Sequence, residues 1–456
     1  MTAPARPARG GRWIDHWEPE DPNFWERTGK KVANRNLWFS ILAEHIGFSM
    51  WTVWSVLVLF MGPAYGIDPA GKFLLVSLPA LIGGLVRIPY TMAPARFGGR
   101  NWTIVSALLL LVPTVLAIIV MEPGTSYSTF LIVAALGGLG GGNFASSMVN
   151  INTFYPEGKK GWALGLNAGG GNIGVPAVQL VGLLVIATVG AAYPRLVLAV
   201  YAPLIVIAAV CAALFMDNIS SVRNDKRAMR EAVRDSQTWV MSFLYIGTFG
   251  SFIGYSFAFG LVLQTQFSRT SLQAASVAFI GPLIGSLIRP VGGWMADRFG
   301  GAKVTLCTFV GMALATGVVI IASEQMSLAL FTAGFITLFV LSGIGNGSTY
   351  KMIPSIFAGK AKMAISSGES SQPALMRARR LSGAVIGIAG SIGALGGLLI
   401  NLAFRQAFLT TKSGIPAFWS FLAFYAACVA VTYVVYLRRA PATAPKHARR
   451  LAYAGV

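Results

Sequence analysis

The sequence predicts an all-α integral membrane protein with twelve transmembrane helices in two six-helix bundles. Of its 456 residues, 55% are hydrophobic and only 11% are charged, whereas soluble domains carry about 25% charged residues. Apolar stretches of about 18 to 25 residues recur along the chain, each long enough to cross a hydrocarbon core about 30 Å thick. One motif also recurs in both halves of the chain, which indicates two related bundles.

The expected spans divide into two sets, separated by the polar segment MDNISSVRNDKRAMREAVRDSQT. The predicted organisation is a cytoplasmic N-terminal segment at 1–36, an N-terminal bundle at 37–215, a cytoplasmic linker at 216–238, a C-terminal bundle at 239–437 and a cytoplasmic tail at 438–456. In chain order we expect spans near residues 37–60, 73–93, 103–121, 129–153, 161–188, 193–215, 239–265, 273–295, 302–322, 328–350, 383–404 and 415–437.

The lysines and arginines are concentrated in alternate loops of the chain. The net charge of +20 would suggest a nucleic-acid partner only if these residues gathered on one soluble face. Most lie in the N-terminal segment, in the loops that join even-numbered to odd-numbered spans, and in the tail. The positive-inside rule then puts both termini on the cytoplasmic side of the membrane, which we expect to be a bacterial-type inner membrane. We expect contact with anionic membrane lipid, and no nucleic-acid partner.

The N-terminal segment is polar and lacks the apolar core of a cleavable signal, so the first span should serve for insertion. The three cysteines, Cys211, Cys307 and Cys428, all fall in apolar spans. They are expected to pack there rather than to form a disulfide or hold a metal. No cofactor and no metal is predicted.

An internal repeat places one arginine inside a span of each half. LIGGLVRIPYTMAPARFGGR (81–100) aligns without a gap with LIGSLIRPVGGWMADRFGGA (283–302), so that Arg87 matches Arg289. The two copies are six spans apart and therefore run in the same direction. Repeats of this kind are related by an axis along the membrane normal, which brings equivalent residues together around a central site.

These two arginines predict an anion site. A charged arginine at the centre of a span costs about 2.5 to 3.5 kcal/mol on insertion scales, and Glu44 is the only carboxylate well inside any span, with His45 beside it. Because no acid lies at the depth of the arginines, their partner should come from outside the protein. An anion about 4 Å from each would gain roughly 4 kcal/mol from each at an effective dielectric near 20. A forked guanidinium suits a planar oxyanion.

The chain resembles the nitrate/nitrite porter (NarK-type) family of the major facilitator superfamily. The resemblance runs from WEPEDPNFW near the N-terminus through the last span. It is carried by two glycine-rich signature segments and their second-half copies, GGGNFASSMVNINTFYP (140–156), GLNAGGGNIGVPAVQ (165–179), LSGIGNGSTYKMIPSIF (341–357) and GAVIGIAGSIGALGG (383–397).

The resemblance implies a nitrate ion held between Arg87 and Arg289. It further implies two hydrogen-bond donors and two flanking aromatic rings, at Asn167, Tyr245, Phe144 and Phe249. Other roles stay open for these four: helix packing for the rings, a place at the membrane interface for the tyrosine, and a helix–helix hydrogen bond for the asparagine.

The RFGG loops of the repeat resemble the superfamily's gating motif. They include Arg96 in the first half, and Asp297 and Arg298 in the second. Asp297 can hold a helix end or a basic partner, whereas Ala95 at the matching position cannot, so gating should differ between the halves. Lys351 is expected either to attract anions at the mouth or to extend to the membrane surface.

The stretch GLNAGGGNIG (165–174) has the glycine spacing of a dinucleotide loop but lacks the preceding strand and the later acidic residue. It lies inside an apolar span, where glycines let helices approach closely. We interpret it as a hinge and packing face, together with its echo IGIAGSIG (386–393). The glycines concerned are Gly169, Gly170, Gly171, Gly174, Gly390 and Gly393.

The predicted function is antiport, with nitrate imported in exchange for nitrite by rocker-switch alternating access, in nitrate assimilation or respiration. Proton-coupled transporters usually carry acids or histidines through the membrane, and Glu44 and His45 have no relay beyond them. Two fixed positive charges without a titratable neighbour should prevent the empty carrier from switching, so exchange should be obligatory.

Other functions remain as alternatives. A proton-coupled nitrate symporter is one, and a transporter or sensor of another small oxyanion is another. An enzyme is not expected, because the longest loop has no room for a catalytic domain. The polar, basic loop at 359–383 could be a regulatory contact or a solvated linker. We expect a monomer.

Overall fold

The protein is a bundle of long helices that run along one axis. A computed structural model describes residues 12–222 and 225–438. In these residues 11 helices are long and apolar enough to cross a membrane, or up to 12 if the bent pair Pro22–Thr52 and Trp54–Phe60 is one span. That pair bends by 40°. The predicted all-α membrane fold is confirmed.

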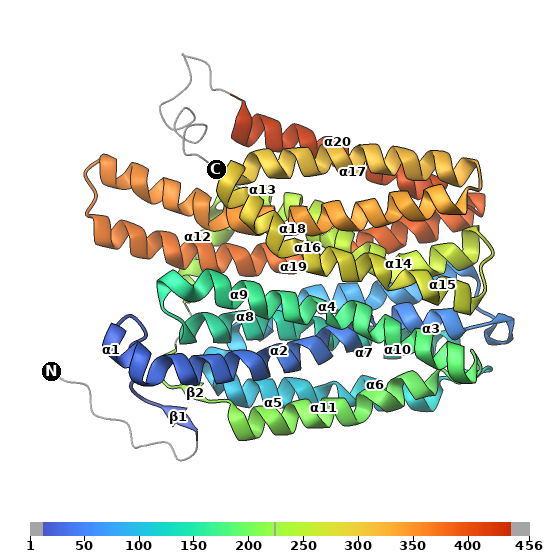
Figure 1. Ribbon diagram of the computed structural model, residues 1–456, viewed down its shortest axis with the longest axis horizontal. Helices are drawn as coiled ribbons and strands as arrows, with labels where there is room; N and C mark the ends of the chain where they lie inside the picture. Colours follow the sequence, from blue (N-terminus) through green and yellow to red (C-terminus); the bar gives the residue numbers. More distant parts are fainter. Residues whose placement is uncertain (1–11, 223–224, 439–456) are drawn as a thin grey trace.

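The first half contains two short strands and a run of helices (Figure 1). Its elements are β1 (Trp13–Ile14), α1 (Pro22–Phe24), the π-helix η1 (Trp25–Gly29), α2 (Lys30–Thr52), α3 (Trp54–Phe60), η2 (Pro63–Tyr65), α4 (Pro69–Phe97), α5 (Gly99–Leu109), α6 (Leu111–Val120), α7 (Tyr127–Gly137), η3 (Gly138–Gly142), α8 (Asn143–Phe154), α9 (Glu157–Asn172), α10 (Gly174–Val189), α11 (Arg195–Phe215) and β2 (Asn218–Ile219).

A short helix, α12 (Lys226–Arg234), leads from the first half into the second. The elements that follow are α13 (Ser236–Tyr245), the π-helix η4 (Ile246–Gly250), α14 (Ser251–Gln266), α15 (Ser271–Ala278), α16 (Ile280–Phe299), α17 (Gly301–Glu324), α18 (Leu328–Ser366), α19 (Ser371–Thr411), α20 (Ile415–Thr432) and the π-helix η5 (Tyr433–Leu437).

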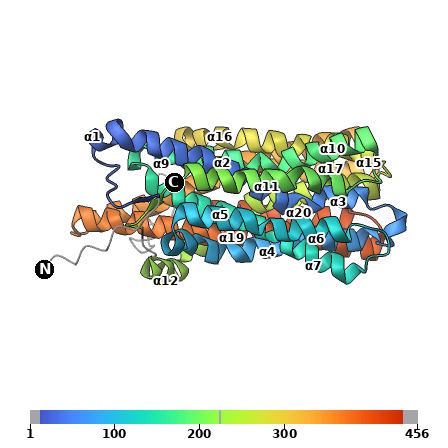
Figure 2. The same cartoon turned by 90° about the horizontal axis from the view of Figure 1, so that it is seen from below.

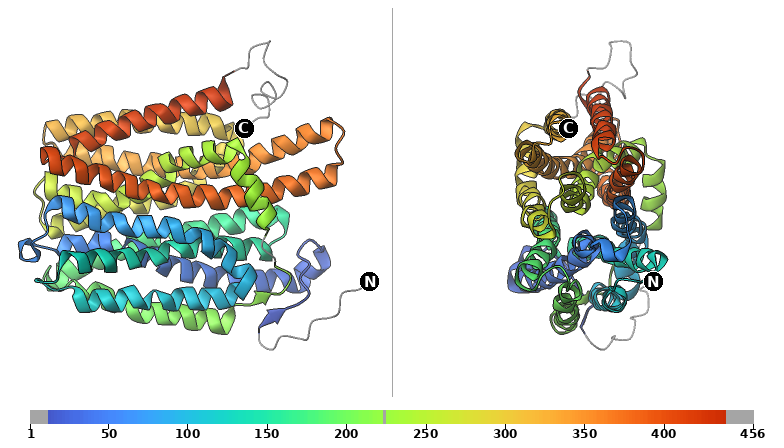
Figure 3. Two further views of the ribbon diagram at one scale, coloured as in Figure 1. Left: turned by 180° about the vertical axis from the view of Figure 1, so that it is seen from behind. Right: turned by 90° about the vertical axis from the view of Figure 1, so that its right-hand side faces the viewer.

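The two halves of the chain lie side by side, the first drawn blue to green and the second yellow to red (Figure 1). Seen along the helices, each half is a separate cluster (Figure 3). The halves meet where α4 packs along α19, where α10 packs on α15, and where α14 packs on α3. Small residues permit the α4–α19 contact: a Cβ on Gly84 would lie 2.6 Å from Leu395 Cδ2.

We call the end of the molecule that carries α12 the linker end. The elements α1, β1 and the outer parts of α18 and α19 lie at this same end (Figures 1 and 2). β1 pairs in parallel with β2, with Trp13 opposite Asn218 and Ile14 opposite Ile219. The predicted N-terminal segment is therefore joined to the predicted linker, although the two are far apart in sequence.

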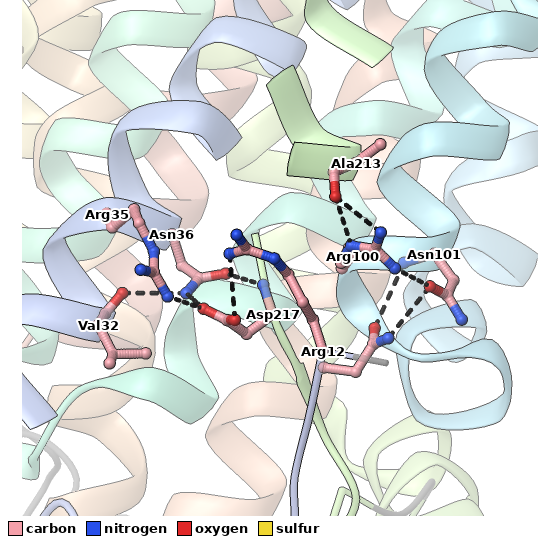
Figure 4. Close-up of polar contacts among 9 residues, drawn as sticks. Arg12, Val32, Arg35, Asn36, Arg100, Asn101, Ala213 and Asp217 are labelled. Carbon is pink, nitrogen blue, oxygen red and sulfur yellow. Dashed lines mark hydrogen bonds and ion pairs between the residues drawn. The ribbon is translucent and has the colours of Figure 1, made fainter. Parts of the chain in front are cut away.

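A polar cluster around Asp217 fixes this junction (Figure 4). The carboxylate accepts hydrogen bonds from Arg35 Nη2 at 2.6 Å and Asn36 Nδ2 at 2.9 Å, and it pairs with Arg12 Nη1 at 3.6 Å. Nearby, Arg100 Nη2 donates to the carbonyl oxygen of Ala213 at 2.7 Å. These contacts satisfy a largely buried carboxylate, and they hold the strand pair against the first half.

The structure corrects the expected loop at 359–383. Helix α18 continues to Ser366 and α19 begins at Ser371, so the segment is a helical hairpin with its turn at Gly368, where φ is +100°. Lys, Ala, Met, Leu and Arg favour helix, and ion pairs support the extension: Arg380 Nε lies 2.7 Å from Asp225 Oδ2. Polarity alone predicted a loop, but polar helix-forming residues continue a helix beyond a membrane equally well.

Candidate functional site

Arg87 on α4 and Arg289 on α16 both lie inside the protein, with 1% and 7% of their surfaces exposed. Arg87 Nε donates to the carbonyl oxygen of Gly141 at 3.1 Å. Its Nη1 donates to the carbonyl oxygen of Gly390 at 2.7 Å, which links the two halves of the molecule. Among the described residues, Arg87 Nη2 and Arg289 Nη1 are buried without a hydrogen-bond partner. Each guanidinium thus keeps a donor for a further ligand.

Aromatic rings surround these charges. The guanidinium carbon of Arg87 lies 4.8 Å from the ring centroid of Phe144 and 5.0 Å from that of Phe249. The two phenylalanine rings stack at 6.3 Å, so both predicted rings flank the predicted arginine. Such faces attract a cation at about 0.5 to 2 kcal/mol each, depending on desolvation. They also exclude water from the site.

Two further rings at the site were not predicted. The ring of Trp51 on α2 lies 5.2 Å from the guanidinium carbon of Arg87, and the ring of Tyr350 on α18 lies 5.6 Å from the guanidinium carbon of Arg289. Tyr350 lies within the second-half signature LSGIGNGSTYKMIPSIF (341–357), so its place in that motif was an available signal. Trp51 lies in the span that also holds Glu44 and His45, but no motif singled out the tryptophan itself.

Tyr245 at the end of α13 is buried and belongs to the same group. It interacts electrostatically with both Arg87 and Arg289, and its ring stacks on that of Phe249 at 5.3 Å. Of the six residues predicted for the site, the structure therefore brings five together: the two arginines, Phe144, Phe249 and Tyr245.

Asn167 on α9, the sixth of these residues, is engaged with a carboxylate. Its Nδ2 donates to Glu44 Oε2 at 2.6 Å and also to the hydroxyl oxygen of Ser147. The Ser147 hydroxyl in turn donates to the same Glu44 oxygen. Glu44 is fully buried and interacts electrostatically with both Arg289 and Arg87.

The expectation that the site has no titratable neighbour is therefore wrong. The sequence did single out Glu44 as the only carboxylate well inside a span, but distance along the chain could not show that α2 brings it to Asn167. His45, the next residue, turns elsewhere: its Nδ1 lies 3.2 Å from the carbonyl oxygen of Gly170.

The glycines of α9 and α10 differ in how closely other residues pack against them. A Cβ on Gly171 would lie 2.3 Å from Glu44 Oε1, and one on Gly174 would lie 2.2 Å from the carbonyl oxygen of His45. A Cβ on Gly170 would meet Ile41 Cγ2 at 2.4 Å, whereas one on Gly169 would have nothing within 4 Å among the described residues.

The second-half glycines border the site directly. A Cβ on Gly393 would lie 2.5 Å from Tyr245 Cδ1, and one on Gly390 would lie 3.8 Å from Arg87 Nη1. These two positions on α19 therefore leave room for the site's own side chains. A hinge role for any of the six glycines stays a prediction.

The two RFGG loops differ in their ion pairing, while their predicted gating role stays a prediction. Asp297 binds a basic partner, Lys351, whose Nζ lies 2.7 Å from Asp297 Oδ2. Arg298 lies over the rings of Trp294 and Phe299 at 5.6 Å. In the first half Arg96 lies over Phe97 at 5.4 Å, and Ala95 has no group that could form an ion pair.

The sequence and the fold of this chain are similar to those of known transport proteins. The profile of the Major Facilitator Superfamily matches residues 37–400. The chain is 37% identical to the nitrate/nitrite transporter NarU of Salmonella typhimurium, over 94% of this chain and 97% of the relative. It is 31% identical to the probable nitrate/nitrite antiporter NarK2 of Thermus thermophilus, with the same two shares covered.

Among solved structures, the chain is similar to the D-xylose–proton symporter. The TM-score is 0.67 at 14% sequence identity, over 88% of this chain and 97% of the symporter chain. At that identity the similarity concerns the fold alone. It agrees with two bundles of helices that lie side by side.

Proposed function

Because the chain belongs to the nitrate/nitrite porter (NarK-type) family of the major facilitator superfamily, we propose that it carries nitrate and nitrite across the bacterial inner membrane. The anion binds between Arg87 and Arg289, and nitrate enters in exchange for nitrite. Alternating access follows from rocking of one bundle against the other around this site. The basic loops favour a cytoplasmic location for both termini.

The observation that carries the proposal is the pair of buried guanidinium groups that each keep a free donor. Within the described chain, Arg87 Nη2 and Arg289 Nη1 have no hydrogen-bond partner. A buried charged donor left unsatisfied costs more than about 1 to 3 kcal/mol. A small anion between the two arginines removes that cost from both bundles at once.

The rings select the shape of the anion. Phe144 and Phe249 stack on each other, and both ring faces lie beside the Arg87 guanidinium. Nitrate and nitrite are planar monoanions that can lie against ring faces and match the forked donors of arginine. Phosphate is tetrahedral and more highly charged, so it would need more donors than the two that the arginines leave free among the described residues.

Exchange is the mode that the relatives favour, since NarK2 of Thermus thermophilus is named a probable antiporter. Without a bound anion, the two guanidinium charges repel each other. A bound anion offsets this repulsion in either direction of transport. The carrier can therefore change conformation in one direction with nitrate bound and in the other with nitrite bound.

Counterflow in proteoliposomes tests the proposal. Purified protein is reconstituted with nitrite, chloride or sulfate inside, at equal pH on both sides, and labelled nitrate is added outside. We expect nitrate uptake to be fastest with nitrite inside, and unlabelled nitrite outside to compete with it. Uptake that does not depend on the internal anion, or that phosphate inhibits as strongly as nitrite does, would contradict the proposal.

A further inference from the structure

Glu44 is a buried carboxylate that anion exchange does not use. It lies on α2, is fully buried, and accepts hydrogen bonds from Asn167 and Ser147 through Oε2. In the described part of the molecule Oε1 has no hydrogen-bond partner. Gly171 leaves room for this oxygen, since a Cβ there would lie 2.3 Å away. The chain thus preserves a space for a carboxyl group beside the site.

Positive charge faces Glu44 from both bundles. Arg87 on α4 and Arg289 on α16 interact with it electrostatically, and Tyr350 on α18 is a further titratable neighbour. His45 follows on α2 itself. A carboxyl group withdrawn from water is stable either as a carboxylate near positive charge or as the neutral acid. Which form is held depends on whether another anion neutralises the arginines.

Asn167 binds this carboxylate and is also the hydrogen-bond donor that the family resemblance implies for nitrate. Its Nδ2 donates to Glu44 Oε2 at 2.6 Å and to the Ser147 hydroxyl. Because a neutral carboxyl group accepts a hydrogen bond more weakly than a carboxylate, a proton on Glu44 releases the Asn167 amide toward the anion.

The net charge of the site leads to the same coupling. With Glu44 ionised and no anion bound, two arginines and one carboxylate leave one positive charge. With nitrate bound and Glu44 protonated, the two arginines and the nitrate again leave one positive charge. The two states are electrostatically alike, so a carrier able to switch in one can switch in the other. The ionised Glu44 replaces the missing anion on the return step.

We propose that Glu44 is a proton-binding site that couples proton entry to nitrate entry. The inference rests on the proposed function as a nitrate carrier and adds net uptake to exchange. On the entry side a proton from water adds to the Glu44 carboxylate, and the Asn167 amide turns to nitrate. On the exit side nitrate leaves, Glu44 returns its proton to water, and the amide donates to the carboxylate again.

The test measures nitrate and protons together in proteoliposomes that contain no nitrite or nitrate. A pH-sensitive dye inside reports proton entry when nitrate is added outside, with membrane potential clamped by potassium and valinomycin. For the wild type we expect proton entry that rises in proportion to nitrate entry. Glu44→Gln keeps a side chain of nearly the same size, but its amide cannot bind and release a proton as the carboxyl group does. Its nitrate-evoked proton entry should fall to the background of protein-free vesicles, while nitrate–nitrite counterflow stays measurable.

Two variants complete the design. Glu44→Asp retains a carboxyl group and should restore nitrate-evoked proton entry over Glu44→Gln. Glu324→Gln removes an exposed acid at the end of α17 and should leave proton entry as in the wild type. Proton entry that persists in Glu44→Gln, or that the wild type lacks while it performs counterflow, would overturn the role of Glu44 and leave the exchange proposal standing. Absence of both activities in the wild type would overturn the proposed function itself.

Discussion

The two arginines are equivalent in the sequence repeat but not in their surroundings. Arg87 donates to two carbonyl oxygens, of Gly141 and Gly390, and three rings lie around its guanidinium. For Arg289, only the ring of Tyr350 lies in that relation among the described residues. Arg87 therefore has more hydrogen-bond and ring contacts than Arg289.

Replacement of either arginine by lysine should weaken nitrate binding. Arg87→Lys and Arg289→Lys keep the charge but remove the forked donor pair. A hydrogen bond to a charged group contributes about 1.5 to 3 kcal/mol, which is roughly a 10- to 100-fold change in affinity. The half-saturating concentration of nitrate in counterflow measures the effect.

The matched control for these variants is Arg195→Lys. Arg195 pairs with Glu122 near the surface, so the exchange of one basic side chain for the other should leave nitrate affinity unchanged. An affinity for nitrate in Arg87→Lys or Arg289→Lys equal to that of the wild type would remove that arginine from the site.

At the scale of elements, two glycines of α9 allow a packing role of glycine to be distinguished from a role in helix bending. A Cβ on Gly171 would lie 2.3 Å from Glu44 Oε1, whereas Gly169 faces open space. Both positions lie in the same helix, two residues apart. A substitution with alanine therefore tests the neighbours of each position rather than the helix as a whole.

We expect Gly171→Ala to lower the melting temperature of the protein and Gly169→Ala to leave it equal or higher. Overpacking a core costs about 1 to 3 kcal/mol, while alanine in place of glycine favours a helix by about 0.5 to 1 kcal/mol. Thermal unfolding in detergent measures both. Equal destabilisation by the two variants would show that flexibility, and not the contact with Glu44, requires glycine here.

At the scale of the whole molecule, contacts between the halves occur at both ends. At the linker end, Arg379 Nε on α19 lies 3.5 Å from Glu157 Oε1 on α9. At the opposite end, Ser271 Oγ and Gln264 Nε2 both donate to the carbonyl oxygen of Leu59, at 2.6 and 3.1 Å. The site between them is closed to solvent, as the low exposure of Arg87 indicates.

In the proposed transport cycle, rocking of the bundles requires the contact at the linker end to open. The double substitution Glu157→Cys and Arg379→Cys, in a background without the three natural cysteines, should allow a bifunctional methanethiosulfonate reagent to cross-link the two positions and stop counterflow, and a reductant should restore it. The control pair, Glu122→Cys and Arg195→Cys, joins residues of one bundle that also form an ion pair. A cross-link there should leave counterflow intact. Full activity of the protein cross-linked between positions 157 and 379 would rule out rocking at this interface.

The sequence by itself determined the order of the spans and the two arginines, and its resemblance to a family added Phe144, Phe249 and Tyr245. The spans and the arginines follow from local properties: apolar length, the cost of a charge in a membrane, and a motif that repeats in both halves. Phe144, Phe249 and Tyr245 belong to short motifs, and the structure brings them to Arg87.

Only the tertiary structure decided what stands next to the site. Glu44 and Asn167 meet because α2 packs against α9, and Trp13 meets Asn218 because two distant polar segments pair at the linker end. Composition and periodicity describe one helix at a time, whereas these contacts depend on how helices rotate and cross. The carboxylate that changes the expected coupling of transport was therefore visible in the sequence, but its partner was not.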